Sequence, residues 1–376
     1  MTGVTELSEA ELDELRSAVR SFLEAKSPEE AVRKTMESDL RYDPQVWAQM
    51  ADQLRLPGLI IPEEYGGDGF GQAALGAVLE EMGRALLCSP FFATVVLGAQ
   101  ALLASGDRDA CARHLPGIAE GRTTAALAVA ENTGAWDPVQ IRTRAVRRES
   151  GAWELTGVKS FVIDGASADL LLVIARTTAG PSLFAVERGA PGLTAEPMET
   201  LDATRAMARL RLEDVPAVLV GTDGAGGRLM ARMLDLGSAA LAAEQTGGAE
   251  RCLESSTAYA NTRVQFGRLI GSFQAIKHKC ADMLVQVELA RASAREAARI
   301  ADLGDEREFA VAAAAAHVCC SRAYVFAAAE NIQVHGGIGF TWEHPAHLYF
   351  RRAKSSQLLF GGPTAYYERF LERLGI

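Results

Sequence analysis

The hydrophobic repeat of this sequence changes twice along the chain, and that change constrains the fold more than any other feature. Apolar residues first recur at helical intervals, and then short β-rich runs such as LLLVIA and SLFAVE are separated by Gly, Pro and Asp. Long helical periods return after Gly227. We therefore predict an N-terminal helical domain, a central antiparallel β-domain and a C-terminal helical domain, over residues 1–122, 123–227 and 228–376.

Local signals support this α, β, α order. Ser8 and Glu11 have the spacing of a capping box, which predicts the start of the first helix. An Ala-rich helix is predicted over residues 309–334, with Gly336 and Gly337 as its C-caps. No G-x-G-x-x-G follows a strand to open a helix, and alternating βαβ units are absent. A Rossmann dinucleotide domain is therefore disfavoured.

Composition excludes several classes of function. The 376 residues carry a formal net charge of -10 and no basic tail, which argues against nucleic-acid binding. The acidic N-terminus lacks the plan of a signal peptide, and no uninterrupted apolar run approaches membrane-spanning length, so we predict a cytoplasmic protein without a membrane span. The six cysteines have no C-x-x-C spacing. A proline separates His344 from His347, so no metal site is expected.

Two segments near the C-terminus carry most of the functional signal. Residues 263–274 read RVQFGRLIGSFQ, with a new helix predicted to begin near Gln274. Residues 333–352 read QVHGGIGFTWEHPAHLYFRR, where paired glycines would let backbone approach a ligand. Exposed N–H groups at such a turn can bind phosphate. A plain structural turn in a helical bundle is the alternative.

These two segments resemble the FAD-contacting signatures of the acyl-CoA dehydrogenase family, and IPEEYGGDGFG and the EEMGRAL helix extend the likeness over essentially the whole chain. The resemblance implies an N-terminal helical domain, a central β-barrel, a C-terminal four-helix bundle and FAD as cofactor. It places Arg263 at the FAD pyrophosphate, with Phe266 and Gln274 beside the cofactor. In the family, residues matching Gln333, Gly336 and Gly337 contact the FAD of a neighbouring subunit. A dimer or tetramer is therefore expected, with Arg263 and the Gln333–Gly337 turn drawn from adjoining protomers.

The flavin-ring end matches the family pattern less well. The family's T-E-x-G-x-G-S-D segment appears here as AENTGAWD, so Ala130 replaces the threonine that bonds the flavin. Val129 precedes it and is carried over as a cofactor-binding residue. In the W-I-T-N-G segment Phe161 keeps an aromatic wall, but Ile163 replaces the hydroxyl. Such hydrogen bonds tune flavin electronics.

The catalytic base is also altered. Abstraction of an α-proton from a thioester needs a carboxylate. The family's glutamate is matched by Gly361, and a second family position, on an earlier helix, is matched by Gly237. Glu244 lies seven residues beyond Gly237, on nearly the same helix face about 10 Å further along, and is the predicted base. Glu250 and Glu254 are expected to be surface charges.

Three functions follow from the resemblance. The first is FAD-dependent α,β-dehydrogenation of an acyl-CoA, with electrons passed to an electron-transfer flavoprotein. The second is a non-catalytic partner subunit that completes the FAD interface of a heterotetramer. The third is a flavin oxidase or monooxygenase of the same fold.

Overall fold

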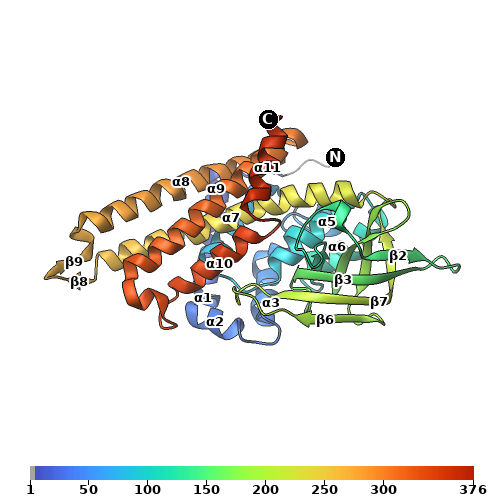
Figure 1. The fold of residues 1–376 in the computed structure, drawn as a ribbon, viewed down its shortest axis with the longest axis horizontal. Helices are drawn as coiled ribbons and strands as arrows, with labels where there is room; N and C mark the ends of the chain where they lie inside the picture. The colour runs from blue at the N-terminus through green and yellow to red at the C-terminus, as the bar shows by residue number, and fades with distance from the viewer. Residues whose placement is uncertain (1–4) are drawn as a thin grey trace. The chain divides into compact units, whose positions relative to one another are not determined.

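The computed structural model describes residues 5–376 and contains two compact units. Unit 1 comprises Lys34–Phe70 and Cys88–Gly237 together with Thr5, and unit 2 comprises Glu6–Arg33, Gly71–Leu87 and Ser238–Ile376. Figure 1 colours the chain from blue at the N-terminus to red at the C-terminus. Each unit therefore combines segments that are distant in the sequence.

Short helices precede the sheet of unit 1, and their starts follow simple capping chemistry. Asp43 accepts a hydrogen bond from the backbone N–H of Gln45 at 2.8 Å, and Asp107 accepts one from Ala110 at 2.9 Å. The π-helix η3 is buried along its whole length. The helical segments are α3 (Pro44–Leu54), η1 (Leu56–Gly58), η2 (Glu63–Tyr65), η3 (Phe92–Ala99), α5 (Gln100–Ser105) and α6 (Arg108–Ala119).

Seven strands of unit 1 form one sheet that closes on itself. The hydrogen-bonded order is β1-β4-β2-β3-β7-β5, β6 pairs with β7, and an additional β4–β5 pairing completes the barrel. Most pairs are antiparallel, whereas β1 and β2 pair with β4 in parallel. The strands are β1 (Ala125–Ala128), β2 (Arg144–Arg147), β3 (Trp153–Ile163), β4 (Leu170–Arg176), β5 (Pro181–Glu187), β6 (Leu193–Pro197) and β7 (Met207–Val220), with η4 (Pro138–Gln140) between β1 and β2.

Unit 2 is helical. The Ser8–Glu11 capping box is confirmed, because the Glu11 backbone N–H donates to Ser8 Oγ and Glu11 Oε2 accepts from the Ser8 backbone N–H at 2.8 Å. The elements are α1 (Glu9–Lys26), α2 (Glu29–Thr35), α4 (Gln72–Arg84), α7 (Gly226–Ala260), β8 (Val264–Gln265), β9 (Arg268–Leu269), η5 (Ile270–Ser272), α8 (Gln274–Leu303), α9 (Glu306–His335), η6 (Gly336–Phe340), α10 (Ala346–Leu358) and α11 (Pro363–Leu374). The first residues of α7 belong to unit 1, and α2 ends there.

Small residues let the helices of unit 2 approach closely. A Cβ atom built on Gly83 of α4 would lie 1.9 Å from the backbone carbonyl oxygen of Glu244 in α7. A Cβ atom built on Gly247 of α7 would lie 1.7 Å from the backbone carbonyl oxygen of Glu80 in α4. These two glycines therefore fix the crossing of α4 and α7. A core of eight buried residues joins α7 to α8, α9 and α10: Ala249, Cys252, Met283, Val287, Tyr324, Ala327, Ala328 and Ala353. The predicted order of helical region, β-barrel and helical bundle is confirmed.

The segment Glu306–Phe340 is long and apolar enough, by length and composition, to cross a membrane. The sequence analysis did not anticipate such a segment. Half of its most apolar window is buried inside the protein. Core helices of globular proteins have the same property, and the Ala-rich faces of α9 pack against α8, α10 and α11.

Candidate functional site

The α7–α8 connection presents Arg263 and Phe266 on a tight hairpin. The Arg263 backbone carbonyl accepts a hydrogen bond from the Ile270 backbone N–H at 2.9 Å, which closes the loop that contains β8 and β9. Phe266 and Gly267 both have positive φ, at 51° and 76°, as a two-residue turn between such strands requires. The Phe266 side chain is 92% exposed. The hairpin therefore holds an aromatic ring out into solvent.

The end of α9 lies against this hairpin in the same chain. Val334 of α9 packs with Ala260 and Ile270, and the rings of Tyr259 and His335 stack with centroids 4.3 Å apart. β8 and β9 lie at one end of the long helices in Figure 1. Within one chain, packing of α7 on α9 therefore brings Arg263 and the Gln333–Gly337 turn to the same end of unit 2. That adjoining protomers share the bound flavin stays a prediction.

This end of unit 2 offers groups that suit an anionic ligand. The Arg263 side chain is exposed and makes no hydrogen bond or ion pair within residues 5–376. Cβ atoms built on Gly336 and Gly337 meet nothing within 4 Å, so open space borders the turn. Gln274 and Gln333 are also exposed. We name these residues, with Phe266, the Arg263 end.

Gly339 also shapes the Arg263 end, and the sequence analysis did not single it out. A Cβ atom there would lie 3.0 Å from the Ile332 carbonyl oxygen and 3.0 Å from His335 Cβ. Glycine thus lets η6 fold back on the last turn of α9. A third glycine, one residue beyond the pair at 336 and 337, was the available signal.

The corresponding segments of unit 1 offer fewer polar groups. Val129 and Ala130 are buried directly after β1, and Ile163 is 4% exposed at the end of β3. Phe161 is 41% exposed and has a φ of 57°, which the bulge of β3 against β7 permits. Its ring lies 3.6 Å from the position of a Cβ built on Gly134. We name these residues the Phe161 segment, and neither Ala130 nor Ile163 gives it a side-chain hydrogen-bonding group.

A buried lysine holds the Phe161 segment together. Lys159 is fully buried, and its Nζ donates to the Val129 carbonyl at 2.9 Å and to Glu131 Oε1 at 3.0 Å. Burial lowers the pKa of Lys159 to about 8. Burial alone would raise the pKa of Glu131, but the Lys159 charge and hydrogen bonds from Thr143 hold it below its usual value. No distinct sequence signal marked this pair, because β3 also carries Glu154, Thr156 and Ser160.

Glu244 is buried on α7 and is paired. Its Oε1 accepts a hydrogen bond from Arg352 Nη1 of α10 at 2.9 Å, and the two side chains are 7% and 3% exposed. The ion pair fixes the carboxylate between two helices and stabilises its ionised form. The prediction that Glu250 and Glu254 are surface charges was wrong. Both side chains are half-buried, because α7 faces other helices there. Glu250 forms an ion pair with Arg291, with Oε1 2.7 Å from Nη2, and Glu254 forms one with Arg84.

The other two positions considered for a base have no carboxylate. Gly361 lies in the turn between α10 and α11 at a φ of 119°, and its N–H donates to the Leu358 carbonyl at 3.3 Å. Gly237 lies within α7. Within residues 5–376, no group of three His, Cys, Asp or Glu residues is arranged to hold a metal ion.

Comparisons with known proteins agree with this architecture. Residues 9–122, 126–215 and 224–372 match the N-terminal, middle and C-terminal domains of acyl-CoA dehydrogenase. A relative from Mycobacterium tuberculosis, acyl-CoA dehydrogenase IpdE2, is 36% identical over 93% of this chain and 92% of its own length.

Two solved structures are similar over nearly the whole chain. The ChsE4-ChsE5 complex from Mycobacterium tuberculosis matches with a TM-score of 0.88 and 30% identity, over 98% of both chains. Butyryl-CoA dehydrogenase from Megasphaera elsdenii matches with a TM-score of 0.90 and 27% identity, over 99% of this chain and 100% of the other.

Proposed function

Because this chain belongs to the acyl-CoA dehydrogenase family, an oxidoreductase family, we propose that it binds FAD and takes part in α,β-dehydrogenation of an acyl-CoA thioester. An electron-transfer flavoprotein is the proposed electron acceptor. The observation that carries the proposal is the Arg263 end, where an open glycine turn lies beside a guanidinium that has no partner among residues 5–376.

The residues of the Arg263 end fit a flavin dinucleotide. Arginine binds phosphate oxygens through a planar fork of N–H donors, and Arg263 has no competing carboxylate within residues 5–376. Gly336 and Gly337 leave room for a diphosphate beside the backbone. The exposed Phe266 ring offers an apolar face to the cofactor. When bound, FAD supplies the hydride acceptor of the reaction.

The base is proposed to come from a second, related chain. Positions 237 and 361 are glycines and cannot act as a base. Glu244 is ion-paired with Arg352, and separating the two side chains would leave buried charges without compensation. The similar structure from Mycobacterium tuberculosis is a complex of ChsE4 and ChsE5. We therefore propose that this chain is the FAD-completing subunit of a heteromeric acyl-CoA dehydrogenase. Its Arg263 end would hold FAD while its partner abstracts the α-proton.

One observation favours a second candidate function. Glu244 is a carboxylate held away from water, as a general base requires, and Arg352 could release it when a thioester binds. In that case the chain would be a homo-oligomeric dehydrogenase, a dimer or tetramer, with Glu244 as its base.

Flavin content after expression alone and with a related chain tests the proposal. We expect the chain to retain little FAD alone and to hold it stoichiometrically in the co-expressed complex. Arg263→Gln should lower FAD retention by that complex, whereas Arg268→Gln, on the same hairpin but with its guanidinium over the Phe273 ring at 4.0 Å, should not. Full FAD occupancy and turnover by the chain alone would contradict the partner role.

A further inference from the structure

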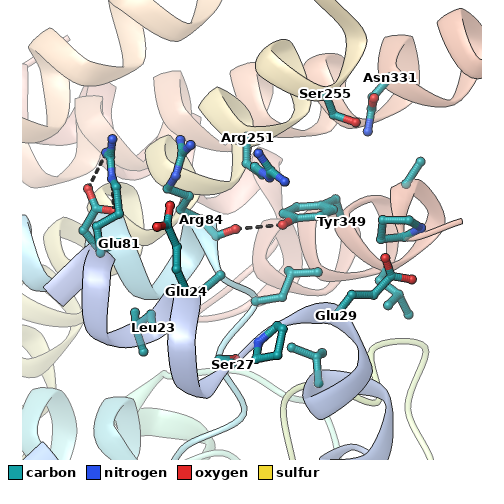
Figure 2. Close-up of a pocket in the computed structure, with 18 residues that line it drawn as sticks. Leu23, Glu24, Ser27, Glu29, Glu81, Arg84, Arg251, Ser255, Asn331 and Tyr349 are labelled. Atoms are coloured by element: carbon teal, nitrogen blue, oxygen red, sulfur yellow. Dashed lines mark hydrogen bonds and ion pairs between the residues drawn. The ribbon is translucent and has the colours of Figure 1, made fainter. Parts of the chain in front are cut away.

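Unit 2 contains a second candidate site, a cavity of about 330 Å³ among α1, α2, α4, α7, α9 and α10. No residue predicted to contact FAD lines it. In Figure 2, Arg251, Tyr349, Ser255 and Asn331 lie on one side of the cavity, and Leu23, Glu24 and Ser27 lie on the other. We name it the Arg251 pocket.

Most charges in the wall of the Arg251 pocket neutralise one another. Arg20 forms a two-pronged ion pair with Glu81, with nitrogen–oxygen distances of 2.8 and 2.7 Å. Arg84 forms another with Glu254, whose Oε1 lies 2.7 Å from Arg84 Nη1. Two-pronged pairs of this kind saturate a carboxylate. These four side chains therefore have little capacity left for a ligand.

Arg251 differs from them. Its nearest carboxylate oxygen is Glu254 Oε2 at 3.5 Å, and Arg84 already contacts that oxygen more closely. A guanidinium carries five N–H donors, and Arg251 uses only some of them on Glu254 and Tyr349, so donors remain for a ligand. Figure 2 shows its guanidinium beside the Tyr349 ring, facing the pocket. The Tyr349 hydroxyl is itself fixed, because it donates to the Arg84 carbonyl at 2.7 Å.

Two further donors lie on the same side of the pocket. Asn331 is 1% exposed, and its Oδ1 accepts from Ser256 Oγ at 3.0 Å. The Asn331 side chain also hydrogen-bonds Cys252, which leaves one of the two amide N–H groups for a ligand. Ser255 is half-buried, and its hydroxyl makes no hydrogen bond within residues 5–376. One wall thus combines a cation, an amide and a hydroxyl.

The rest of the lining selects the kind of anion. The remaining wall is largely apolar and includes Leu23, Val32 and Leu348. Glu29 lines the pocket but is paired with Arg33 at 2.7 Å, so Glu24 is the carboxylate on the α1–α2 side that would most repel a multiply charged anion such as phosphate. We propose that the Arg251 pocket binds a small amphipathic monocarboxylate, with its carboxylate on Arg251 and its apolar tail toward Leu23 and Leu348. This inference does not rest on the proposed function.

Calorimetric titration of the purified full-length protein, in its native assembly, tests the proposal. The probe is 4-methylpentanoate, and the matched control is 4-methylpentanamide, which has nearly the same shape without the charge. We expect saturable binding of the carboxylate and binding of the amide at least about tenfold weaker, because charged hydrogen bonds to arginine are the strong ones. Arg251→Gln should weaken carboxylate binding by a similar factor. Arg299→Gln, whose ion pair with Glu296 is on the surface, should leave it unchanged.

A second variant keeps the test decisive if Arg251→Gln fails to fold. Ala85 is half-buried and lines the pocket, so Ala85→Leu should fill part of the cavity and abolish binding while Arg251 is retained. Equal binding of acid and amide, no binding of either, or full binding by Ala85→Leu would each overturn the proposal.

Discussion

The Arg263 end of unit 2 and the Phe161 segment of unit 1 differ in what they offer a ligand. The first presents an unpaired guanidinium, an exposed aromatic ring and two glycines bordered by open space. The second has the buried apolar residues Ala130 and Ile163 where the family pattern has hydroxyls. Its buried Lys159 is paired with Glu131 of the same chain. On the proposed function, the Arg263 end would bind the diphosphate, and the Phe161 segment would contribute no side-chain hydroxyl to tune a flavin ring.

The largest effect on stability is expected at the buried ion pair between Glu244 and Arg352. We propose that this pair keeps Glu244 from acting as the base. Arg352→Met should lower the free energy of unfolding by about 3–5 kcal/mol, because it leaves a buried carboxylate without its partner. Denaturant unfolding measures the change. The double variant Glu244→Leu/Arg352→Met should recover most of the loss. If Arg352→Met were as stable as the unaltered protein, Glu244 would not depend on this pair and could serve as a base.

A smaller effect is expected at the Arg263 end. Arg263→Gln in the native assembly should weaken FAD retention by about tenfold or more, since a charge-assisted hydrogen bond contributes about 1.5–3 kcal/mol. Equilibrium dialysis with FAD gives the affinity directly. An unchanged affinity would show that the contrast between the two regions does not concern diphosphate binding.

The Phe161 segment should respond to pH through Lys159. Its pKa in the folded protein is about 8, against 10.5 for an ordinary lysine, so the unfolded chain binds the extra proton between these values. The free energy of unfolding, relative to a Lys159→Met variant, should therefore rise by up to about 1.4 kcal/mol per pH unit from pH 8 to 10.5. Parallel denaturation curves at several pH values test this. A relative stability that fell over the same range would mean that the ion pair with Glu131 outweighs burial.

The smallest effect is expected at Ile163, because we propose that the flavin ring lies against the partner chain. Ile163→Thr restores a hydroxyl at the flavin-ring position, yet the reduction potential of FAD in the assembly should not change if the ring lies against the partner. The variant should cost only about 1–3 kcal/mol of stability, for a hydroxyl placed in a buried position. A clear shift of the potential would place the flavin ring beside Ile163 itself.

Features encoded by neighbouring residues were predictable from the sequence. The Ser8–Glu11 capping box, the start of α8 at Gln274 and the end of α9 at Gly336 are all confirmed, because each depends on residues within one helical turn. The short β-rich runs also predicted the central β-domain, whereas its closure into a barrel was implied by the family resemblance. The boundaries at residues 122 and 227 stay predictions.

Features that join distant segments were not predictable in this way. Glu244 and Arg352 are 108 residues apart, and nothing near either residue indicates the other. The half-burial of Glu250 and Glu254 and the contact of the Arg263 hairpin with α9 likewise depend on how helices pack. Periodicity identifies the buried face of a helix but not its neighbour. Lys159 was missed for the same reason, since Glu131 becomes its partner only when the barrel closes.

The source of the base is tested most directly by anaerobic bleaching of flavin absorbance by an acyl-CoA in a FAD-loaded assembly that carries Glu244→Gln. Gln keeps an oxygen acceptor toward Arg352, so the fold and the FAD content should persist. If the partner supplies the base, the flavin bleaches to the same extent as in the unaltered assembly. Loss of bleaching at normal FAD content would contradict the partner's role and identify Glu244 as the base.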